Sequence, residues 1–214
     1  MLKYFLMSKI LNLLQSVNAI YTDDHFVYTS GKHGEVYINK DSLYPHTKIT
    51  SQVCKILAQK CANLEIDTVV APALGGIILS QWMSHHLSEI KEKEIYAVYA
   101  EKDPIKTFVI TRGYDKLVKA KNVLVVEDLT NTGGSVKKVV DTVREYGGNV
   151  TGVCIMVNRS PQTVTSKMFN APLIVGDILQ AKAWEEKDCQ LCKNNVPVNT
   201  QMGHGKKYVQ SKNK

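Results

Sequence analysis

Residues 123–136 read VLVVEDLTNTGGSV, which is an apolar run followed by two acids, a polar turn and the start of a helical pattern. A short continuous apolar run that leads through a Gly-rich turn into a helix predicts a strand buried in a parallel sheet. Ligands of open parallel sheets bind beyond the carboxyl ends of the strands. The turn after this strand is therefore the first place to look for a functional site.

The turn itself favours a phosphate. A polar turn before a helix directs several backbone N–H groups to one point, and the helix dipole adds positive potential there. Gly133 and Gly134 let the backbone approach the ligand closely, while the hydroxyls of Thr130, Thr132 and Ser135 can donate hydrogen bonds. We therefore predict a phosphate-binding loop.

Two acids, Glu127 and Asp128, stand directly before this anion site. They would repel a phosphate unless they face a different part of the ligand. A sugar diol with an associated divalent cation accounts for acids and phosphate together, because carboxylate oxygens suit both groups.

Outward from this stretch, strands and helices alternate. Apolar runs at 67–72, 94–100 and 150–158 flank helical patterns near 75–87 and 135–147, and a further helix is expected to begin near Thr47, which can cap it. The pattern predicts an α/β fold with a parallel sheet covered on both faces.

Residues 25–41 predict two short extended segments around a Ser-Gly-Lys-His-Gly turn. An amphipathic N-terminal helix is favoured over a signal peptide, with its apolar face formed by Leu6, Ile10, Leu13, Leu14 and Val17.

Composition sets broad limits. The 214 residues, 44% of them hydrophobic, can bury an ordinary core without disulfides or metals, so one main domain with a small appendage is expected. The net charge of +7 suits a polyanionic ligand or an ordinary basic surface. Five scattered cysteines favour a reducing, cytoplasmic compartment, and no stretch reaches the length of a membrane span.

The strand, the Glu-Asp pair and the Thr-Asn-Thr-Gly-Gly-Ser turn resemble the motif with which type I phosphoribosyltransferases bind phosphoribosyl pyrophosphate (PRPP). The resemblance implies that Glu127 and Asp128 contact the ribose hydroxyls. It implies that the 5′-phosphate lies against Leu129, Thr130, Asn131, Thr132, Gly133, Gly134 and Ser135. Asn131 stands where many members have Thr.

Two further segments resemble the orotate enzymes of this family. Residues 69–80, VVAPALGGIILS, are similar to their second loop, whose backbone N–H groups at Ala73, Leu74, Gly75 and Gly76 would face the pyrophosphate. Residues 99–128 resemble the flexible catalytic loop and the strand leading from it. Mobile cations there would stabilise the departing pyrophosphate, with Lys102 as the first candidate and Lys106 as the second. Arg112 is either a further catalytic cation or an anchor of the loop.

The base is expected to meet Arg159, because orotate enzymes carry an arginine at this place and a guanidinium matches a carboxylate in two-point fashion. Residues 28–39 resemble the segment that covers the base. The residues expected to bind orotate are Asn131, Arg159, Ser30, Lys32 and Tyr37. Thr29 occupies a position where many members have a lysine that contacts PRPP, and Lys32 is the alternative.

The tail segment 188–200 is similar to the Cys-x-Leu-Cys ending of this subgroup. Cys189 and Cys192 have metal-ligand spacing, and His204 could add a third ligand, but no second Cys pair follows. Two unpaired structural thiols are therefore favoured over a zinc site. The pair His85 and His86 suits packing or surface better than a metal, because neighbours on a helix face different directions.

The resemblance implies a type I phosphoribosyltransferase fold, with a parallel-centred sheet of five strands flanked by helices and a small N-terminal hood. A single domain, 1–214, would comprise the helix and hood (1–45), the core (46–182) and a tail (183–214). The implied reaction transfers the phosphoribosyl group of PRPP to orotate, with Lys102, Lys106 and Asp128 as catalytic residues. Mg²⁺ would be held mainly by PRPP and not ligated directly by the protein. The resemblance also implies a homodimer in which the catalytic loop of one subunit reaches the site of the other, with neither nucleic acid nor membrane as partner. The alternatives are a transferase acting on another base and a non-catalytic PRPP-sensing regulator that binds nucleic acid.

Overall fold

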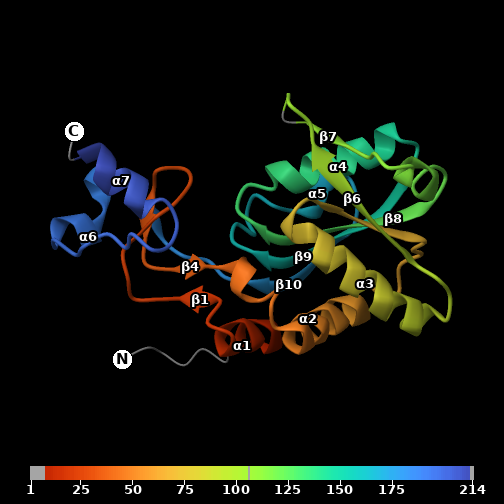
Figure 1. Cartoon of the computed structure of the whole chain (residues 1–214), viewed down its shortest axis with the longest axis horizontal. Helices are drawn as coiled ribbons and strands as arrows, with labels where there is room; N and C mark the ends of the chain where they lie inside the picture. The colour runs from red at the N-terminus through yellow and green to blue at the C-terminus, as the bar shows by residue number, and fades with distance from the viewer. Residues whose placement is uncertain (1–7, 106, 213–214) are drawn as a thin grey trace. The chain divides into compact units, whose positions relative to one another are not determined.

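The computed structural model describes residues 8–105 and 107–212, and their contacts divide the chain into two compact units (Figure 1). The core unit comprises Tyr44–Leu179 and the chain up to Leu13. The small unit comprises Leu14–Leu43 and Gln180–Lys214, so it unites two segments far apart in sequence. The first of the boundaries between the units lies within helix α1 (Lys9–Ser16).

The core unit is built on one six-stranded sheet in the order β10-β9-β8-β5-β6-β7. Its strands are β5 (Thr68–Pro72), β6 (Tyr96–Lys102), β7 (Phe108–Val109), β8 (Asn122–Thr130), β9 (Asn149–Asn158) and β10 (Leu173–Ile178). Five strands are parallel, and the short β7 pairs with β6 antiparallel at the edge. The expected parallel-centred sheet is confirmed, with β7 as an addition to the five strands.

Helices cover both faces of this sheet (Figure 1). They are α2 (Thr47–Lys60), α3 (Gly75–Lys91), α4 (Gly134–Glu145) and α5 (Ser166–Phe169), with the short 3-10 turn η2 (Tyr114–Leu117). The 3-10 turn η1 (Lys40–Ser42) belongs to the small unit. Val123 and Val125 of β8 pack in one cluster with α4. Successive strand residues alternate between faces, so Leu124 and Val126 point to the opposite side, where α2 and α3 lie. Helix α2 begins at Thr47 as predicted, but His46 occupies the cap position and no side chain caps the helix there.

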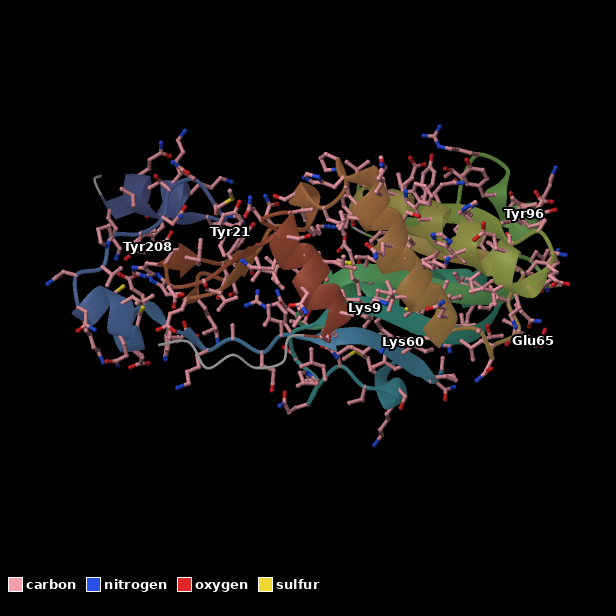
Figure 2. The ribbon with its side chains drawn as sticks, turned by 90° about the horizontal axis from the view of Figure 1, so that it is seen from below. Lys9, Tyr21, Lys60, Glu65, Tyr96 and Tyr208 are labelled. Carbon is pink, nitrogen blue, oxygen red and sulfur yellow. The ribbon has the colours of Figure 1, made fainter. Side chains whose placement is uncertain are left out.

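The first helices are tied to the edge strand β10. The Leu11 backbone N–H donates to the Asp177 carboxylate at 3.2 Å. Lys60, at the C-terminal end of α2, donates from Nζ to the Val175 carbonyl at 3.3 Å (Figure 2). These bonds attach α1 and α2 to a strand that has no strand neighbour on its outer side.

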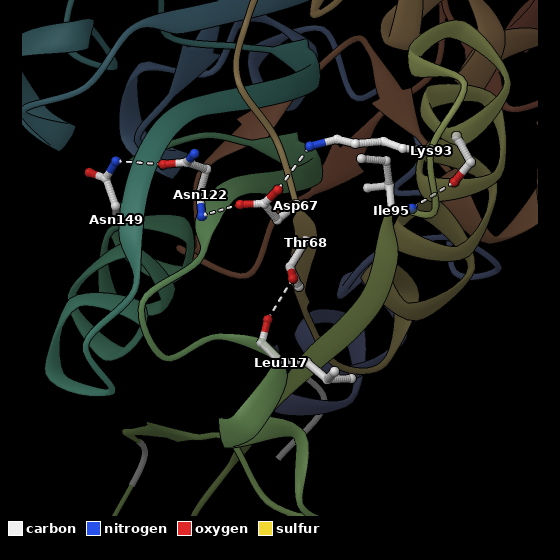
Figure 3. Close-up of polar contacts among 8 residues, drawn as sticks. Asp67, Thr68, Lys93, Ile95, Leu117, Asn122 and Asn149 are labelled. Carbon is white, nitrogen blue, oxygen red and sulfur yellow. Dashed lines mark hydrogen bonds and ion pairs between the residues drawn. The ribbon is translucent and has the colours of Figure 1, made fainter.

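A polar network joins the amino ends of the central strands (Figure 3). Asp67 accepts hydrogen bonds from Lys93 Nζ at 2.9 Å and from the Asn122 backbone N–H at 3.0 Å. The Asn122 side chain in turn accepts from Asn149 Nδ2 at 2.8 Å. Side-chain hydrogen bonds therefore link the amino ends of these strands, whereas the loops of the candidate site follow their carboxyl ends.

The small unit contains two little sheets and most of the tail. Strands β1 (Ile20–Tyr21) and β4 (Tyr37–Ile38) pair antiparallel, and β2 (Phe26–Val27), β3 (His33–Gly34) and β11 (Ala183–Trp184) form a sheet in the order β11-β3-β2. The tail adds η3 (Glu186–Asp188), α6 (Gln190–Lys193) and α7 (Gly205–Lys212), the helix that carries Tyr208 (Figure 2). Among the described residues, no helix combines the length and the apolar character needed to cross a membrane.

Candidate active site

The two acids of β8 are buried at the end of the strand that carries them. Asp128 is 1% exposed and Glu127 7% exposed. The Asp128 carboxylate accepts one hydrogen bond from the Tyr44 hydroxyl and one from the Leu129 backbone N–H, both at 2.6 Å. The Glu127 carboxylate accepts from the Asp128 N–H at 3.2 Å. Buried carboxylates need such donors, and these bonds also fix their orientation.

Tyr44 was missed by the sequence analysis, because a lone tyrosine before a proline carries no motif. Burial and then the neighbouring Asp128 carboxylate raise the pKa of the Tyr44 hydroxyl far above its usual range. The hydroxyl therefore keeps its proton and acts as a permanent hydrogen-bond donor to Asp128.

The loop after β8 is organised by its own threonines. The Gly133 N–H donates to Thr130 Oγ1 at 2.9 Å, and the Gly134 N–H donates to Thr132 Oγ1 at 3.4 Å. Because both hydroxyl oxygens accept from the loop, their protons remain available to donate to a ligand. Asn131, Thr132, Gly134 and Ser135 are exposed, Leu129 is half-buried, and Thr130 and Gly133 are buried beneath them.

Any residue other than glycine at position 133 would distort the loop. The φ of Gly133 is 75°, in the left-handed region, and a Cβ there would lie 2.5 Å from Met168 Sδ. The Lys137 N–H bonds back to the Gly133 carbonyl at 2.8 Å and starts the helical ladder. The preceding N–H groups therefore lie at the N-terminus of α4, the arrangement that binds phosphates.

Of the second predicted loop, Ala73 and Leu74 connect β5 to α3, whereas Gly75 and Gly76 already form the first turn of α3. The Ala73 N–H donates to the Ala100 carbonyl of β6 at 2.8 Å, and the Ala73–Leu74 peptide bond is cis. The Leu74 side chain is 83% exposed, so the tip of the loop is open to solvent. Because β5 lies between β8 and β6 and all three are parallel, this loop and the phosphate loop occupy the same edge of the sheet.

The segment expected to be a catalytic loop forms a hairpin of β6 and β7. Lys102, the last residue of β6, is exposed and pairs with Phe108, whose ring centroid lies 5.8 Å from its Nζ. Lys106 lies outside the described residues. Part of the predicted loop is therefore strand, because β7 and β6 share backbone hydrogen bonds.

Arg112 anchors this hairpin. Its guanidinium donates to the Glu101 carboxylate at 3.0 Å, and Thr111 donates to the same group at 2.7 Å. The bonds from Arg112 and then from Thr111 lower the pKa of Glu101. Of the two roles considered for Arg112, the structure supports the anchor.

Arg159 directly follows β9 and lies beside the phosphate loop. Its backbone N–H donates to the Thr130 carbonyl at 2.9 Å. The buried Asn158 side chain accepts from the Ser160 N–H at 2.9 Å and donates to the Val164 carbonyl at 3.2 Å, which shapes the turn around the arginine. The structure thus brings Arg159 together with Glu127, Asp128 and the phosphate loop.

The other candidates for the base lie in the small unit. Ser30 and Lys32 belong to a tight turn closed by the Tyr28 N–H and the Lys32 carbonyl at 2.8 Å, with Gly31 at a φ of 81°. Lys32 forms an ion pair with Glu185 at 3.2 Å, and the Tyr37 ring packs on Phe26. The contact of these residues with a base stays a prediction.

Comparison with known proteins defines the class. The model of the phosphoribosyl transferase domain family matches residues 39–179, a span that contains both loops, the hairpin and Arg159. The chain therefore belongs to the phosphoribosyltransferase family, as the sequence motifs predicted.

Its curated relatives are named orotate phosphoribosyltransferases. The enzyme of Caldanaerobacter subterraneus subsp. tengcongensis is 33% identical over 190 residues, which cover 89% of this chain and 94% of that protein. The enzyme of a Thermoanaerobacter species is 36% identical over 174 residues, covering 81% and 86%. The solved structure of Mycobacterium tuberculosis orotate phosphoribosyltransferase in complex with PRPP matches with a TM-score of 0.62 at 20% identity, covering 80% of this chain and 97% of that one. At that identity the structural match supports the fold.

Proposed function

We propose that this protein is an orotate phosphoribosyltransferase, which converts PRPP and orotate into orotidine 5′-phosphate and pyrophosphate in pyrimidine biosynthesis. The observation that carries the proposal is the hydrogen bond between the Arg159 N–H and the Thr130 carbonyl. This backbone bond supports the proposal because it joins the backbone of Arg159, whose guanidinium suits the orotate carboxylate, to a loop suited to the phosphate of PRPP. The names of the curated relatives agree with this substrate pair.

In this proposal the phosphate loop binds the 5′-phosphate of PRPP. The N–H groups at the start of α4 and the hydroxyls of Thr130, Thr132 and Ser135 donate to its oxygens. Glu127 and Asp128 accept from the ribose hydroxyls, and Tyr44 holds the Asp128 carboxylate in place for that contact. The backbone of Ala73–Gly76 receives the pyrophosphate at the same edge of the sheet.

The donor set also fits a magnesium ion bound together with PRPP. Two buried carboxylates at the end of β8 offer the hard oxygen atoms that Mg²⁺ prefers, and Mg²⁺ commonly binds through one or two carboxylates plus substrate phosphates. Glu127 and Asp128 would add to the contacts that PRPP supplies to the ion, in contrast to the expectation from the resemblance that the protein does not ligate it directly. The ion would neutralise part of the pyrophosphate charge.

Catalysis then rests on position and charge. A ring nitrogen of orotate attacks C1′ as the bond from C1′ to the pyrophosphate oxygen breaks. The electron pair of that bond leaves with pyrophosphate, and the proton of the ring nitrogen passes to pyrophosphate or water. Lys102, at the exposed end of β6, is the first candidate to stabilise the charge that develops on the leaving group, and Lys106 is the second. No covalent intermediate with the protein is required.

Orotate is selected through its carboxylate in this proposal. Arg159 grips that group in two-point fashion, and Asn131 is the other proposed contact from the core unit. The proposed contacts of Ser30, Lys32 and Tyr37 with the base rest on the resemblance of residues 28–39 to the segment that covers it. We further propose a homodimeric enzyme of the cytoplasm that has neither nucleic acid nor membrane as a partner.

The deciding experiment incubates the protein with PRPP, Mg²⁺ and orotate, uracil, adenine or hypoxanthine, and follows pyrophosphate release. Release with orotate and little with the other bases is the expected result. Preference for another base would refute the orotate assignment and keep the PRPP site. PRPP binding without release with any base would instead favour the non-catalytic regulator.

A further inference from the structure

The small unit contains a cluster of two histidines and two cysteines that the proposed reaction does not use. His25, His33, Cys189 and Cys192 each offer one potential ligand atom, and these atoms all lie within 4.8 Å of one another. His25, His33 and Cys189 are buried and Cys192 is half-buried. The residues come from both segments of the unit, so their meeting depends on its fold.

The spacing of the four atoms suits a tetrahedral ion. Zinc bonds of about 2.0–2.1 Å to nitrogen and about 2.3 Å to sulfur place neighbouring ligand atoms roughly 3.3–3.8 Å apart. Cys192 Sγ lies 3.4 Å from His33 Nδ1 and 3.8 Å from His25 Nε2, and Cys189 Sγ lies 3.7 Å from His25 Nε2. The two ring nitrogens are closer together, at 2.8 Å.

The hydrogen bond on the far side of His25 fixes which of its atoms can bind a metal. Its Nδ1 lies 2.8 Å from the Val196 carbonyl oxygen. A carbonyl only accepts, so Nδ1 carries the proton and neutral His25 presents the lone pair of Nε2 to the cluster. Metal-ligating histidines are typically oriented by such a bond from the other ring nitrogen to a carbonyl.

His33 adds a constraint on the protons. Without an ion, His33 Nδ1 must donate a hydrogen bond to His25 Nε2, because the proton of His25 is on its Nδ1. His33 Nε2 then carries no proton and can only accept a hydrogen bond. That atom is buried and has no hydrogen-bond partner among the described residues. An ion that takes lone pairs from both facing nitrogens removes this requirement on the His33 proton.

We propose that His25 Nε2, His33 Nδ1, Cys189 Sγ and Cys192 Sγ form a structural zinc site. Two thiolates and two imidazoles are a donor set typical of zinc, and four protein ligands leave no open position for catalysis. The sequence alone favours two unpaired thiols and offers His204 as a third ligand. In the structure His204 Nε2 lies 3.2 Å from Thr29 Oγ1, and the histidines of the cluster are His25 and His33.

The site would stabilise the small unit by joining its two segments. His25 and His33 belong to the N-terminal segment, and Cys189 and Cys192 to the tail. The two histidines also flank the turn that carries Ser30 and Lys32. If the proposed function holds, the ion therefore fixes both ends of a turn that meets the base.

The first test is the zinc content of the full chain, purified without chelators and measured by elemental analysis. About one zinc per chain is expected in the wild type, in Cys61→Ala and in His204→Ala. Cys61 is a matched control, since it is a buried cysteine of the core unit. Cys189→Ala and His33→Ala should each lower the zinc content to a small fraction of that value. Equal zinc in all these proteins would overturn the proposal.

A second test uses only the wild-type protein, so it does not depend on whether a variant folds. Zinc is removed from the wild-type protein under reducing conditions, and Co²⁺ is titrated in while the absorption spectrum is followed. The proposal predicts intense visible bands of tetrahedral cobalt, a near-ultraviolet thiolate band, saturation near one ion per chain and loss of the bands on addition of zinc. Weak octahedral bands or no binding would overturn it, as would freshly purified protein with a disulfide between Cys189 and Cys192. These readouts are independent of transferase activity, so they separate the zinc site from the proposed reaction.

Discussion

The carboxylate of Asp128 is held by the Tyr44 hydroxyl and the Leu129 N–H, and it is proposed to bind the ribose of PRPP. Asp128→Asn keeps the shape of the side chain and removes its charge. A hydrogen bond to a charged group contributes about 1.5–3 kcal/mol, so PRPP affinity should fall by roughly 10- to 100-fold. Titration calorimetry with PRPP and Mg²⁺ measures the change directly.

Tyr44→Phe provides a graded companion to this variant, because it removes one of the two donors to Asp128 and leaves the charge. A smaller loss of affinity than in Asp128→Asn is expected. PRPP affinity unchanged in Asp128→Asn, with the thermal unfolding midpoint preserved, would contradict the assignment of the ribose contact.

Arg159 is the residue that should distinguish orotate from uracil, since the two bases differ by one carboxylate. Removing one partner of a hydrogen-bonded charge pair in a closed site costs roughly 2–5 kcal/mol. Arg159→Ala should therefore lower kcat/KM for orotate by about 30-fold or more and hardly change that for uracil. The ratio of the two kcat/KM values is the measurement.

Arg159→Lys serves as a control, because it keeps the charge and loses the two-point fork, so an intermediate ratio is expected. PRPP binding should persist in both variants. An Arg159→Ala enzyme that keeps the full orotate preference would refute this role.

At the scale of elements, the β6–β7 hairpin presents Lys102 at the edge where the loops after β5 and β8 lie. A cation that acts mainly on the charge developing in the transition state lowers turnover more than substrate affinity when it is removed. Lys102→Ala should reduce kcat by about 100-fold and change PRPP affinity by less than about threefold. Single-turnover kinetics and a PRPP titration give the two numbers.

Lys116→Ala is a matched control for loss of one lysine charge, because Lys116 lies on η2 and has no proposed contact with PRPP. Its kcat should stay within about twofold of the wild type. If PRPP affinity and kcat fell in parallel in Lys102→Ala, the lysine would be a ground-state contact.

The elements that the sequence predicts are those whose pattern is local. Strands β5, β8 and β9 are continuous apolar runs, and α4 ends at a Gly-Gly pair, so each could be located from its own residues. Strand β10 was not identified from its residues, because Gly176 and Asp177 interrupt its apolar pattern. Strand β11, α6 and α7 were missed because contacts with residues of the N-terminal segment hold the tail in place.

The candidate site divides in the same way. The phosphate loop and Arg159 lie on motifs that are contiguous or directly follow a strand, so the sequence located them. Tyr44 reaches Asp128 across 84 positions, and His25 meets Cys189 across 164. Such contacts exist only in the folded chain, and no local pattern predicts them.

At the scale of the whole molecule, stability should depend on pH through Asp67, which joins β5 to Asn122 and Lys93 (Figure 3). The hydrogen bond from Lys93 and then that from the Asn122 N–H lower the pKa of this carboxyl. A carboxyl whose pKa is lower in the folded state stabilises the fold fully above its unfolded value, near 3.9, and this contribution is lost as the pH falls through the folded value. Asp67→Asn should lower the free energy of unfolding by about 1 kcal/mol at pH 7.

The corresponding measurement is urea unfolding of the wild type and Asp67→Asn across a pH series. The difference should stay constant above about pH 4 and shrink at more acid pH. Lys93→Gln, which removes the cationic partner, should show a smaller loss with the same trend. A difference that does not change down to the acid limit of the folded state would show that the charge of Asp67 contributes nothing.

The last prediction follows from the proposed homodimer. If the hairpin of one subunit completes the site of the other, Lys102 and Asp128 of a single site come from different chains. A dimer of one Lys102→Ala chain and one Asp128→Asn chain then contains one intact site and one doubly altered site. Random pairing makes half of the dimers mixed, so a refolded equal mixture should regain about a quarter of the wild-type activity. Each variant alone should remain close to inactive at limiting PRPP. Activity in the mixture no greater than the average of the two variants would place both residues of a site in the same chain, and a monomer by light scattering would refute the dimer itself.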